Sequence, residues 1–81
     1  MNAVPLTVRE TAVLRAIAQG LLSREIAAQL NISKKTVDRH RERISRKLGV
    51  HGTARIVMYA FSTGLVEFSS AKAAVGRLFV E

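Results

Sequence analysis

The feature that most constrains this chain is a pair of helical patterns separated by only three or four residues. Apolar residues in the segment 23–30 recur at the spacing of one helix face, and a second pattern begins at about residue 34. Asn31 lies between them, and asparagine tolerates the positive φ that a tight turn requires. Ala27 is small enough to let two helices cross closely, and Val37 is placed to pack back on the first helix. Helices joined this tightly are typical of a helix-turn-helix.

Start and stop signals predict two further helices around this pair. Thr7 and Glu10 have the spacing of a capping box, and Gly20 ends the first helix, predicted over about 8–19. Each later helix follows a residue whose side chain can cap a helix N-terminus. These helices, with their predicted caps, are about 24–30 (Ser23), 34–48 (Ser33) and 54–63 (Thr53).

No segment alternates between polar and apolar residues as a strand does. The predicted fold class is therefore all-α: a four-helix bundle in which the second and third helices form the helix-turn-helix. The predicted domain covers residues 1–66, and a C-terminal extension covers 67–81. Ser69 and Ser70 are candidate caps for a short helix in that extension.

Composition excludes several classes of protein. Eighty-one residues suit one small domain, and the absence of cysteine excludes disulfides and thiolate metal sites. No apolar run reaches the roughly 18 residues that a membrane span needs, and the first ten residues do not resemble a signal peptide. We therefore expect a cytoplasmic protein without a membrane partner or cofactor.

The charge of the chain indicates a polyanionic partner. The net charge is +7, and nucleic acid is the commonest partner of so basic a domain. A protein that binds the ribosome or an acidic membrane could have the same net charge. The segment 34–47 holds seven Lys and Arg residues against two acids, a net charge of +5. Because that segment is the second helix of the helix-turn-helix, double-stranded DNA is the predicted partner.

One face of that helix carries the residues expected to read bases. Lysine or arginine can bind guanine through two acceptors, and an acid can accept a hydrogen bond from cytosine N4. At spacings of three, four and seven, the expected base-contacting residues are Lys35, Asp38, Arg39 and Glu42. A second interpretation stays open for the two acids, which could instead pair with Arg41, Arg39 or Arg46 on the helix surface.

Flanking side chains are expected to bind phosphates, which sets the register on DNA without reading its sequence. This set comprises Arg24, Ser33, Lys34, Thr36, His40, Arg43 and Lys47. A packing role stays open for His40, and we expect Arg41 to face solvent or phosphate. With one other histidine and no cysteine, a zinc site is not expected.

The predicted fourth helix is apolar nearly all round, which suggests one face on the core and another on a partner. The expected homodimer interface comprises Ile56, Val57, Tyr59 and Ala60. The sequence contains no nucleophile–base–acid set and no glycine-rich phosphate loop, so no enzyme activity is expected.

Several motifs together resemble the LuxR/FixJ-type (GerE-like) helix-turn-helix domain. They are LTVRE at 6–10, SREIAAQLNIS at 23–33, KTVDRH at 35–40, KLGV at 47–50 and YAFSTGLV at 59–66. The resemblance implies a bacterial transcription regulator whose third helix enters the major groove and whose fourth helix forms a two-fold dimer. It places the groove-facing positions on Lys35, Asp38, Arg39 and Glu42. RNA polymerase or another regulator is a further candidate partner, and the nucleoid is the expected site of action.

The chain departs from the family pattern at three places. Asp38 and Glu42 replace residues that are often basic, so the DNA sequence read should differ from familiar family sites. Thr53 stands where an arginine is frequent, and about fifteen residues follow the usual end. Two competing hypotheses remain: a σ-factor-like or phage-type DNA module, and an adaptor that binds another regulator. The sequence fits a free-standing regulator and a fragment of a larger one equally.

Overall fold

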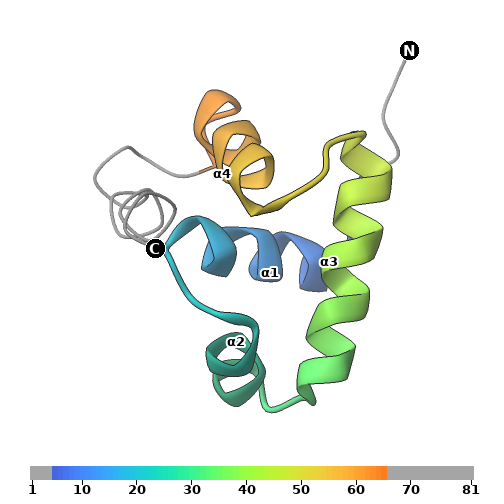
Figure 1. Ribbon diagram of the computed structural model, residues 1–81, viewed down its shortest axis with the longest axis vertical. Helices are drawn as coiled ribbons and strands as arrows, with labels where there is room; N and C mark the ends of the chain where they lie inside the picture. Colours follow the sequence, from blue (N-terminus) through green and yellow to red (C-terminus); the bar gives the residue numbers. More distant parts are fainter. Residues whose placement is uncertain (1–4, 66–81) are drawn as a thin grey trace.

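The computed structural model describes residues 5–65, which form four α-helices and no strand (Figure 1). The helices are α1 (Val8–Ala18), α2 (Ser23–Leu30), α3 (Lys34–Leu48) and α4 (Thr53–Ser62). These bounds confirm the all-α prediction, and each predicted boundary lies within one residue of the observed one. The predicted C-terminal extension and its candidate helix lie outside the described residues.

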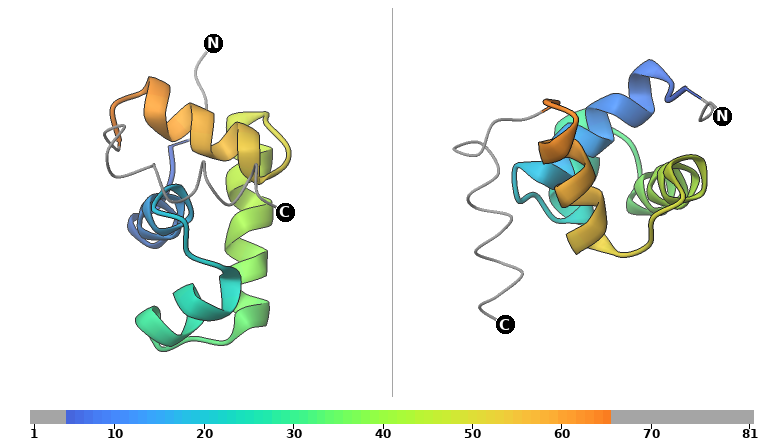
Figure 2. Two further views of the ribbon diagram at one scale, coloured as in Figure 1. Left: turned by 60° about the vertical axis from the view of Figure 1, so that its left-hand side comes forward. Right: turned by 90° about the horizontal axis from the view of Figure 1, so that it is seen from above.

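Helix α1 lies at the centre of the bundle and packs against all three other helices. Figure 1 shows it between α4 and α2, with α3 running along one side, and Figure 2 shows the same arrangement from two other directions. Side chains of all four helices meet in one apolar core. Its largest fully buried members include Leu14, Ile17, Ile26 and Ile44. The core therefore fixes α3 by its inner face.

Two of the predicted N-terminal caps are confirmed. At α1, Thr7 N–H donates to Glu10 Oε1 at 2.9 Å and Glu10 N–H donates to Thr7 Oγ1 at 3.0 Å, which completes the capping box. At α3, Thr36 N–H donates to Ser33 Oγ at 3.0 Å. Each cap satisfies a backbone donor that the first helical turn leaves without a partner.

The other two predicted caps are wrong, because Ser23 and Thr53 are the first residues inside their helices. Leu22 precedes α2, and its N–H donates to Glu25 Oε1 at 2.6 Å. Gly52 precedes α4 with φ of 90°, a conformation that glycine adopts without strain. The Thr53 hydroxyl, expected to cap α4, instead accepts a hydrogen bond from Arg41 of α3.

The turn between α2 and α3 has the predicted left-handed residue. Asn31 has φ of 58° and is the only non-glycine residue with positive φ in the segment 5–65. The following residue, Ile32, donates its N–H to Ala27 O at 3.0 Å, which closes the end of α2. This turn sets the direction in which α3 leaves α2.

A buried ion pair connects the start of α1 to the end of α3. The Glu10 side chain is 1% exposed, and Lys47 Nζ donates to its Oε1 at 2.7 Å and to Pro5 O at 3.3 Å. The hydrogen bond from Lys47 is the main reason that the pKa of Glu10 lies below its ordinary value, and hydrogen bonds from Thr7 lower it further against the opposing effect of burial. A buried carboxylate needs such partners, so Lys47 has a structural role.

We expect Lys47→Met to lower the free energy of unfolding by about 2–4 kcal/mol, because it leaves the Glu10 carboxylate buried without its cation. Urea denaturation followed by circular dichroism at pH 7 measures the change. Lys34→Met is the matched control, since its ion pair with Asp38 is exposed on the surface and should contribute less than about 1 kcal/mol. Equal losses for the two variants would contradict the structural role of Lys47.

The same pair predicts a pH dependence. Because folding lowers the pKa of Glu10 from its ordinary value of 4.5, its charged form favours the folded state. Its contribution is therefore complete above pH 4.5 and disappears as the pH falls through the lower folded pKa. Glu10→Gln should be less stable than the natural protein by about 1–3 kcal/mol at pH 7. Urea titrations from pH 7 to pH 3 should show this difference shrinking, and a constant difference would contradict the assignment.

Candidate nucleic-acid interface

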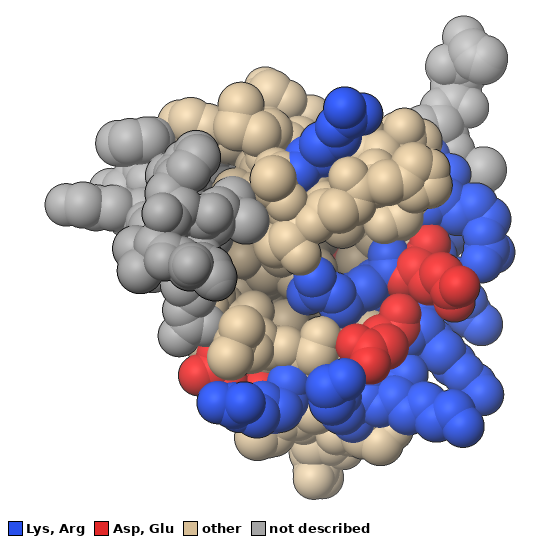
Figure 3. Space-filling model, viewed as in Figure 1, with Lys and Arg blue, Asp and Glu red and all other residues tan. Residues whose placement is uncertain are grey.

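The helix α3 has an inner apolar face and an outer charged face. Val37 and Ile44 are completely buried in the core, and Leu48 packs against it in part. The four expected base-contacting residues are all exposed on other sides of the helix: Lys35, Asp38, Arg39 and Glu42. Figure 3 shows Lys and Arg side chains gathered over the side of the molecule formed by α3, with acidic side chains among them.

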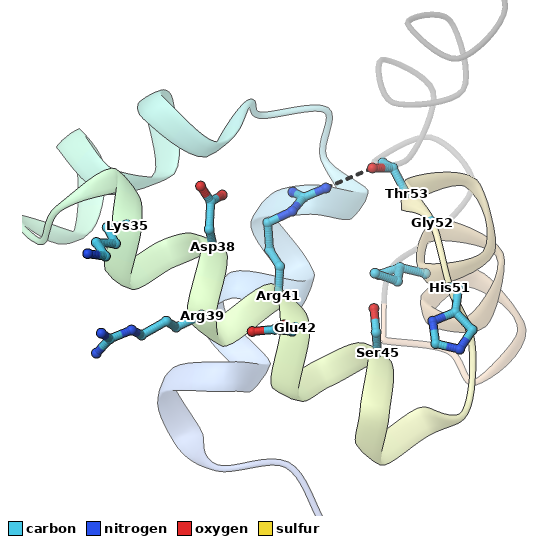
Figure 4. Close-up of a pocket in the computed structure, with 10 residues that line it drawn as sticks. Lys35, Asp38, Arg39, Arg41, Glu42, Ser45, His51, Gly52 and Thr53 are labelled. Carbon is cyan, nitrogen blue, oxygen red and sulfur yellow. Dashed lines mark hydrogen bonds between the residues drawn. The ribbon is translucent and has the colours of Figure 1, made fainter.

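A shallow groove runs beside these residues, between α3 and the start of α4 (Figure 4). Lys35, Asp38, Arg39 and Glu42 all line it. Its other walls come from later in the chain or from deeper on α3: Arg41, Ser45, His51, Gly52, Thr53 and Ile56. The structure thus brings the four predicted residues together on one accessible surface.

Three of these four side chains make no polar contact within the described part of the chain. Lys35, Arg39 and Glu42 have neither a hydrogen bond nor an ion pair to any residue of 5–65. In Figure 4 the side chains of Lys35 and Arg39 project away from α4. Their charged groups are therefore available to a ligand without first breaking an internal interaction.

Asp38 differs, because it already has an ion-pair partner. Lys34 Nζ donates to Asp38 Oδ2 at 2.9 Å within α3. This hydrogen bond is the main reason that the pKa of Asp38 lies below its ordinary value, and the nearby Ser23 hydroxyl lowers it further. The alternative of a surface ion pair, left open for the two acids, is thus realised for Asp38, but its partner is Lys34 rather than Arg41, Arg39 or Arg46.

Arg41 is a residue whose role the sequence did not indicate. It was expected to face solvent or phosphate, but it is half-buried, and its Nη2 donates to Thr53 Oγ1 at 2.7 Å (Figure 4). Burial lowers the pKa of the Arg41 guanidinium, which the negative charge of Asp38 opposes. The bond joins α3 to the start of α4, and only the position of α4 could have revealed it.

Five of the seven predicted phosphate donors lie at or near the surface at the α2–α3 end or along α3. Arg24, Lys34 and Arg43 are exposed, and Lys34 is held in its ion pair with Asp38. Ser33 and Thr36 share a hydrogen bond of 2.9 Å between their hydroxyls at the start of α3. All five remain accessible to a ligand that approaches α3 from outside.

The other two predicted phosphate donors lie deeper. His40 is half-buried, and its Nδ1 is buried without a hydrogen-bond partner among the described residues. Lys47 is turned toward the buried Glu10 carboxylate and is 22% exposed. The structure thus places the Lys47 ammonium group in an internal ion pair, and the phosphate contact expected for it stays a prediction.

The expected dimer face of α4 also requires a correction. Three of its four residues lie in the protein's own core, because they face α1: Ile56, Val57 and Ala60. Tyr59 is half-buried. The large apolar side chains that α4 presents to solvent are instead Met58, 61% exposed, and Phe61, 36% exposed.

Within residues 5–65, no group of three or more His, Asp or Glu side chains is arranged to hold a metal ion. None of the four helices is both long enough and apolar enough to cross a membrane.

A helical bundle that presents a basic helix after a tight turn is the arrangement of helix-turn-helix DNA-binding domains. The sequence matches the family model of bacterial regulatory proteins, luxR family, over residues 4–60. The chain belongs to this family, and its helices α1–α4 form the family's helix-turn-helix domain.

Individual relatives agree with this assignment. The chain is 43% identical over 63 residues to the Fimbriae Z protein of Salmonella typhimurium, covering 78% of this chain and 30% of the relative. It is 44% identical over 57 residues to the transcriptional regulatory protein UhpA of Escherichia coli, covering 70% and 29%. The crystal structure of the response regulator ChrA, from a heme-sensing two-component system, is similar with a TM-score of 0.73 and 35% identity, covering 82% and 33%. The chain thus spans about a third of the length of these relatives.

Proposed function

We propose that this chain is the part of a transcription regulator that recognises a specific DNA sequence, with α3 in the major groove. The observation that carries the proposal is the outer face of α3, where Lys35, Arg39 and Glu42 are exposed and make no polar contact within residues 5–65. A charged surface that only kept the protein in solution would not require these groups on the second helix of a tight helix-turn-helix.

The dimensions of α3 suit this role. Its 15 residues extend for about 22 Å at the usual rise per residue, and a major groove about 12 Å wide admits one helix. Lys35 and Arg39 lie in its N-terminal half, the part that contacts base edges in helix-turn-helix proteins, and Glu42 lies within one turn of Arg39.

Phosphates on either side of the groove would be held by the exposed donors described above. Arg24 is the second residue of α2, where the backbone N–H groups of the helix N-terminus also favour an anion. Ser33 and Thr36 provide hydroxyls at the start of α3, and Lys34 and Arg43 provide cations. These contacts would fix the register of α3 on the duplex.

The proposed assembly is a homodimer on two half-sites, formed through the outward side of α4. Met58 and Phe61 support this, since two large apolar side chains on one short helix are otherwise exposed to water. Val50, Tyr59 and Arg55 form the surface next to Met58. In this proposal the protein acts in the cytoplasm on the nucleoid, and RNA polymerase or another regulator would be its protein partner.

One observation favours a second function, that of an adaptor for another regulator. Glu42 and Asp38 place two negative charges on the surface that would approach DNA, and such charges repel phosphates. An adaptor would bind its partner through this surface or α4 and would show no preference among DNA sequences.

Arg39→Ala should weaken binding to the preferred DNA sequence by about 1–3 kcal/mol and relax one base position, because it removes a side chain placed to bind guanine. Arg43→Ala should weaken binding to preferred and scrambled sequences about equally, because phosphate contacts carry no sequence information. Fluorescence anisotropy with both duplexes at several salt concentrations measures the two effects.

Arg15→Ala is the matched control for this pair, since it removes the same charge from an exposed position on α1 rather than α3. Arg15→Ala should leave the affinity for the preferred duplex and the affinity for the scrambled duplex almost unchanged. Equal losses on preferred and scrambled DNA for Arg39→Ala would refute its base-reading role, and a protein without any sequence preference would favour the adaptor.

Met58→Asp should shift the protein toward the monomer, because it places a charge at the centre of the proposed apolar interface. Sedimentation equilibrium at micromolar concentration measures the dissociation constant, which should rise by tenfold or more. Val8→Asp is the control, since Val8 is also an exposed apolar residue but lies on α1. A dimer unaffected by Met58→Asp would place the interface elsewhere.

A further inference from the structure

Asp38 and Glu42, the two acids on the outer side of α3, have different surroundings, although the sequence analysis gave them the same predicted role. Asp38 Oδ2 accepts a hydrogen bond of 2.9 Å from Lys34 Nζ. The Glu42 carboxylate, one turn later, receives none from any residue of 5–65. Both side chains line the groove in Figure 4, so this difference does not result from burial.

The Asp38 carboxylate already has a partner on its own helix. Lys34, the first residue of α3, lies one turn earlier and donates to Asp38 Oδ2 at 2.9 Å. Part of its hydrogen-bonding capacity is thereby used, and the positive charge of Lys34 offsets its own. A ligand would encounter at Asp38 a neutralised pair rather than an open acceptor.

Glu42 presents the opposite situation, an exposed carboxylate with all of its acceptor capacity unused. Beside a polyanion this charge is unfavourable unless a hydrogen-bond donor meets it, because no cation of residues 5–65 is paired with it. Arg39 lies three residues earlier and Arg46 four residues later, both exposed on the same side of α3. The attraction of these cations for DNA would bring the carboxylate close to the base edges.

The chemistry of the bases then limits what Glu42 can accept. In the major groove guanine and thymine present acceptors, which repel a carboxylate. Adenine presents its N6 amino group beside its own acceptor N7, whereas cytosine itself presents only the N4 amino group. Cytosine is therefore the base that an unpaired carboxylate distinguishes best from the other three.

We propose that Glu42 determines part of the DNA specificity of this protein by accepting a hydrogen bond from a cytosine N4 amino group, whereas Asp38 does not read a base. This inference rests on the proposed function, because it requires α3 to lie in the major groove. It assigns different tasks to two acids that the sequence placed in one set.

The test is a selection from a pool of random-sequence duplex DNA with three proteins: the natural chain, Glu42→Gln and Asp38→Asn. Each substitution replaces a carboxylate by an amide of the same shape. The natural protein should select a motif with a cytosine at one position, and changing that cytosine to guanine or thymine should weaken binding about tenfold or more. Glu42→Gln should lose this preference at that position alone, or replace it with adenine, which a glutamine amide can bind through N6 and N7.

Asp38→Asn should keep the cytosine and change affinity for all duplexes by a similar factor. Circular dichroism of both variants checks that the helices are intact. The inference is overturned if Glu42→Gln selects the same cytosine as the natural protein, or if Asp38→Asn is the variant that loses it. If the natural protein selects no motif at all, the proposed function fails together with this inference. If it selects a motif but Glu42→Gln leaves the cytosine unchanged, only this inference fails.

Discussion

The packing of α1 against the other three helices is the interaction on which the rest of the structure depends. Leu14 and Ile17 of α1 are buried together with Ile26 of α2 and Ile44 of α3. Each helix is too short to be stable alone in water, so its helical form relies on burying this apolar side. The outer face of α3 is exposed because its inner face is fixed to α1.

Charged residues on α3 divide into two groups according to the direction in which they leave the helix. Lys47 and Arg41 turn inward or sideways and bind Glu10 and Thr53, so their charges help to hold α1 and α4 against α3. Lys35 and Arg39 leave the opposite side without a partner in the described chain. The net charge of +5 in this segment therefore comes from two kinds of side chain: those that bind other residues of the protein and those that do not. Only the second kind can bind DNA without losing a contact inside the protein.

Local signals in the sequence predicted the helices well. The capping box of Thr7 and Glu10, the cap at Ser33 and the left-handed Asn31 depend on residues no more than a few positions apart. The two wrong caps show the limit of this approach. Ser23 and Thr53 have suitable side chains, but each is the first residue inside its helix. The Thr53 hydroxyl accepts a hydrogen bond from Arg41 of α3, a contact that depends on how α3 and α4 pack.

The sequence predicted where the candidate site lies, but it did not predict which apolar residues of α4 are buried and which are exposed. The helical period placed Lys35, Asp38, Arg39 and Glu42 on one outer surface, because spacings of three and four fix a shared face whatever surrounds the helix. The period of α4 alone could not separate a core face from an exposed one, since both are apolar. The neighbouring α1 decided that Ile56 and Val57 are buried and that Met58 faces solvent.

The sequence by itself determined the helices, the tight turn and the basic outer face, because capping, turn conformation and helical period act within a few residues. Only the tertiary structure decided that Lys47 neutralises Glu10 and that Arg41 reaches Thr53. These assignments depend on which side chains from separate helices come within hydrogen-bonding distance. That distance is set by the packing of the core rather than by any local pattern.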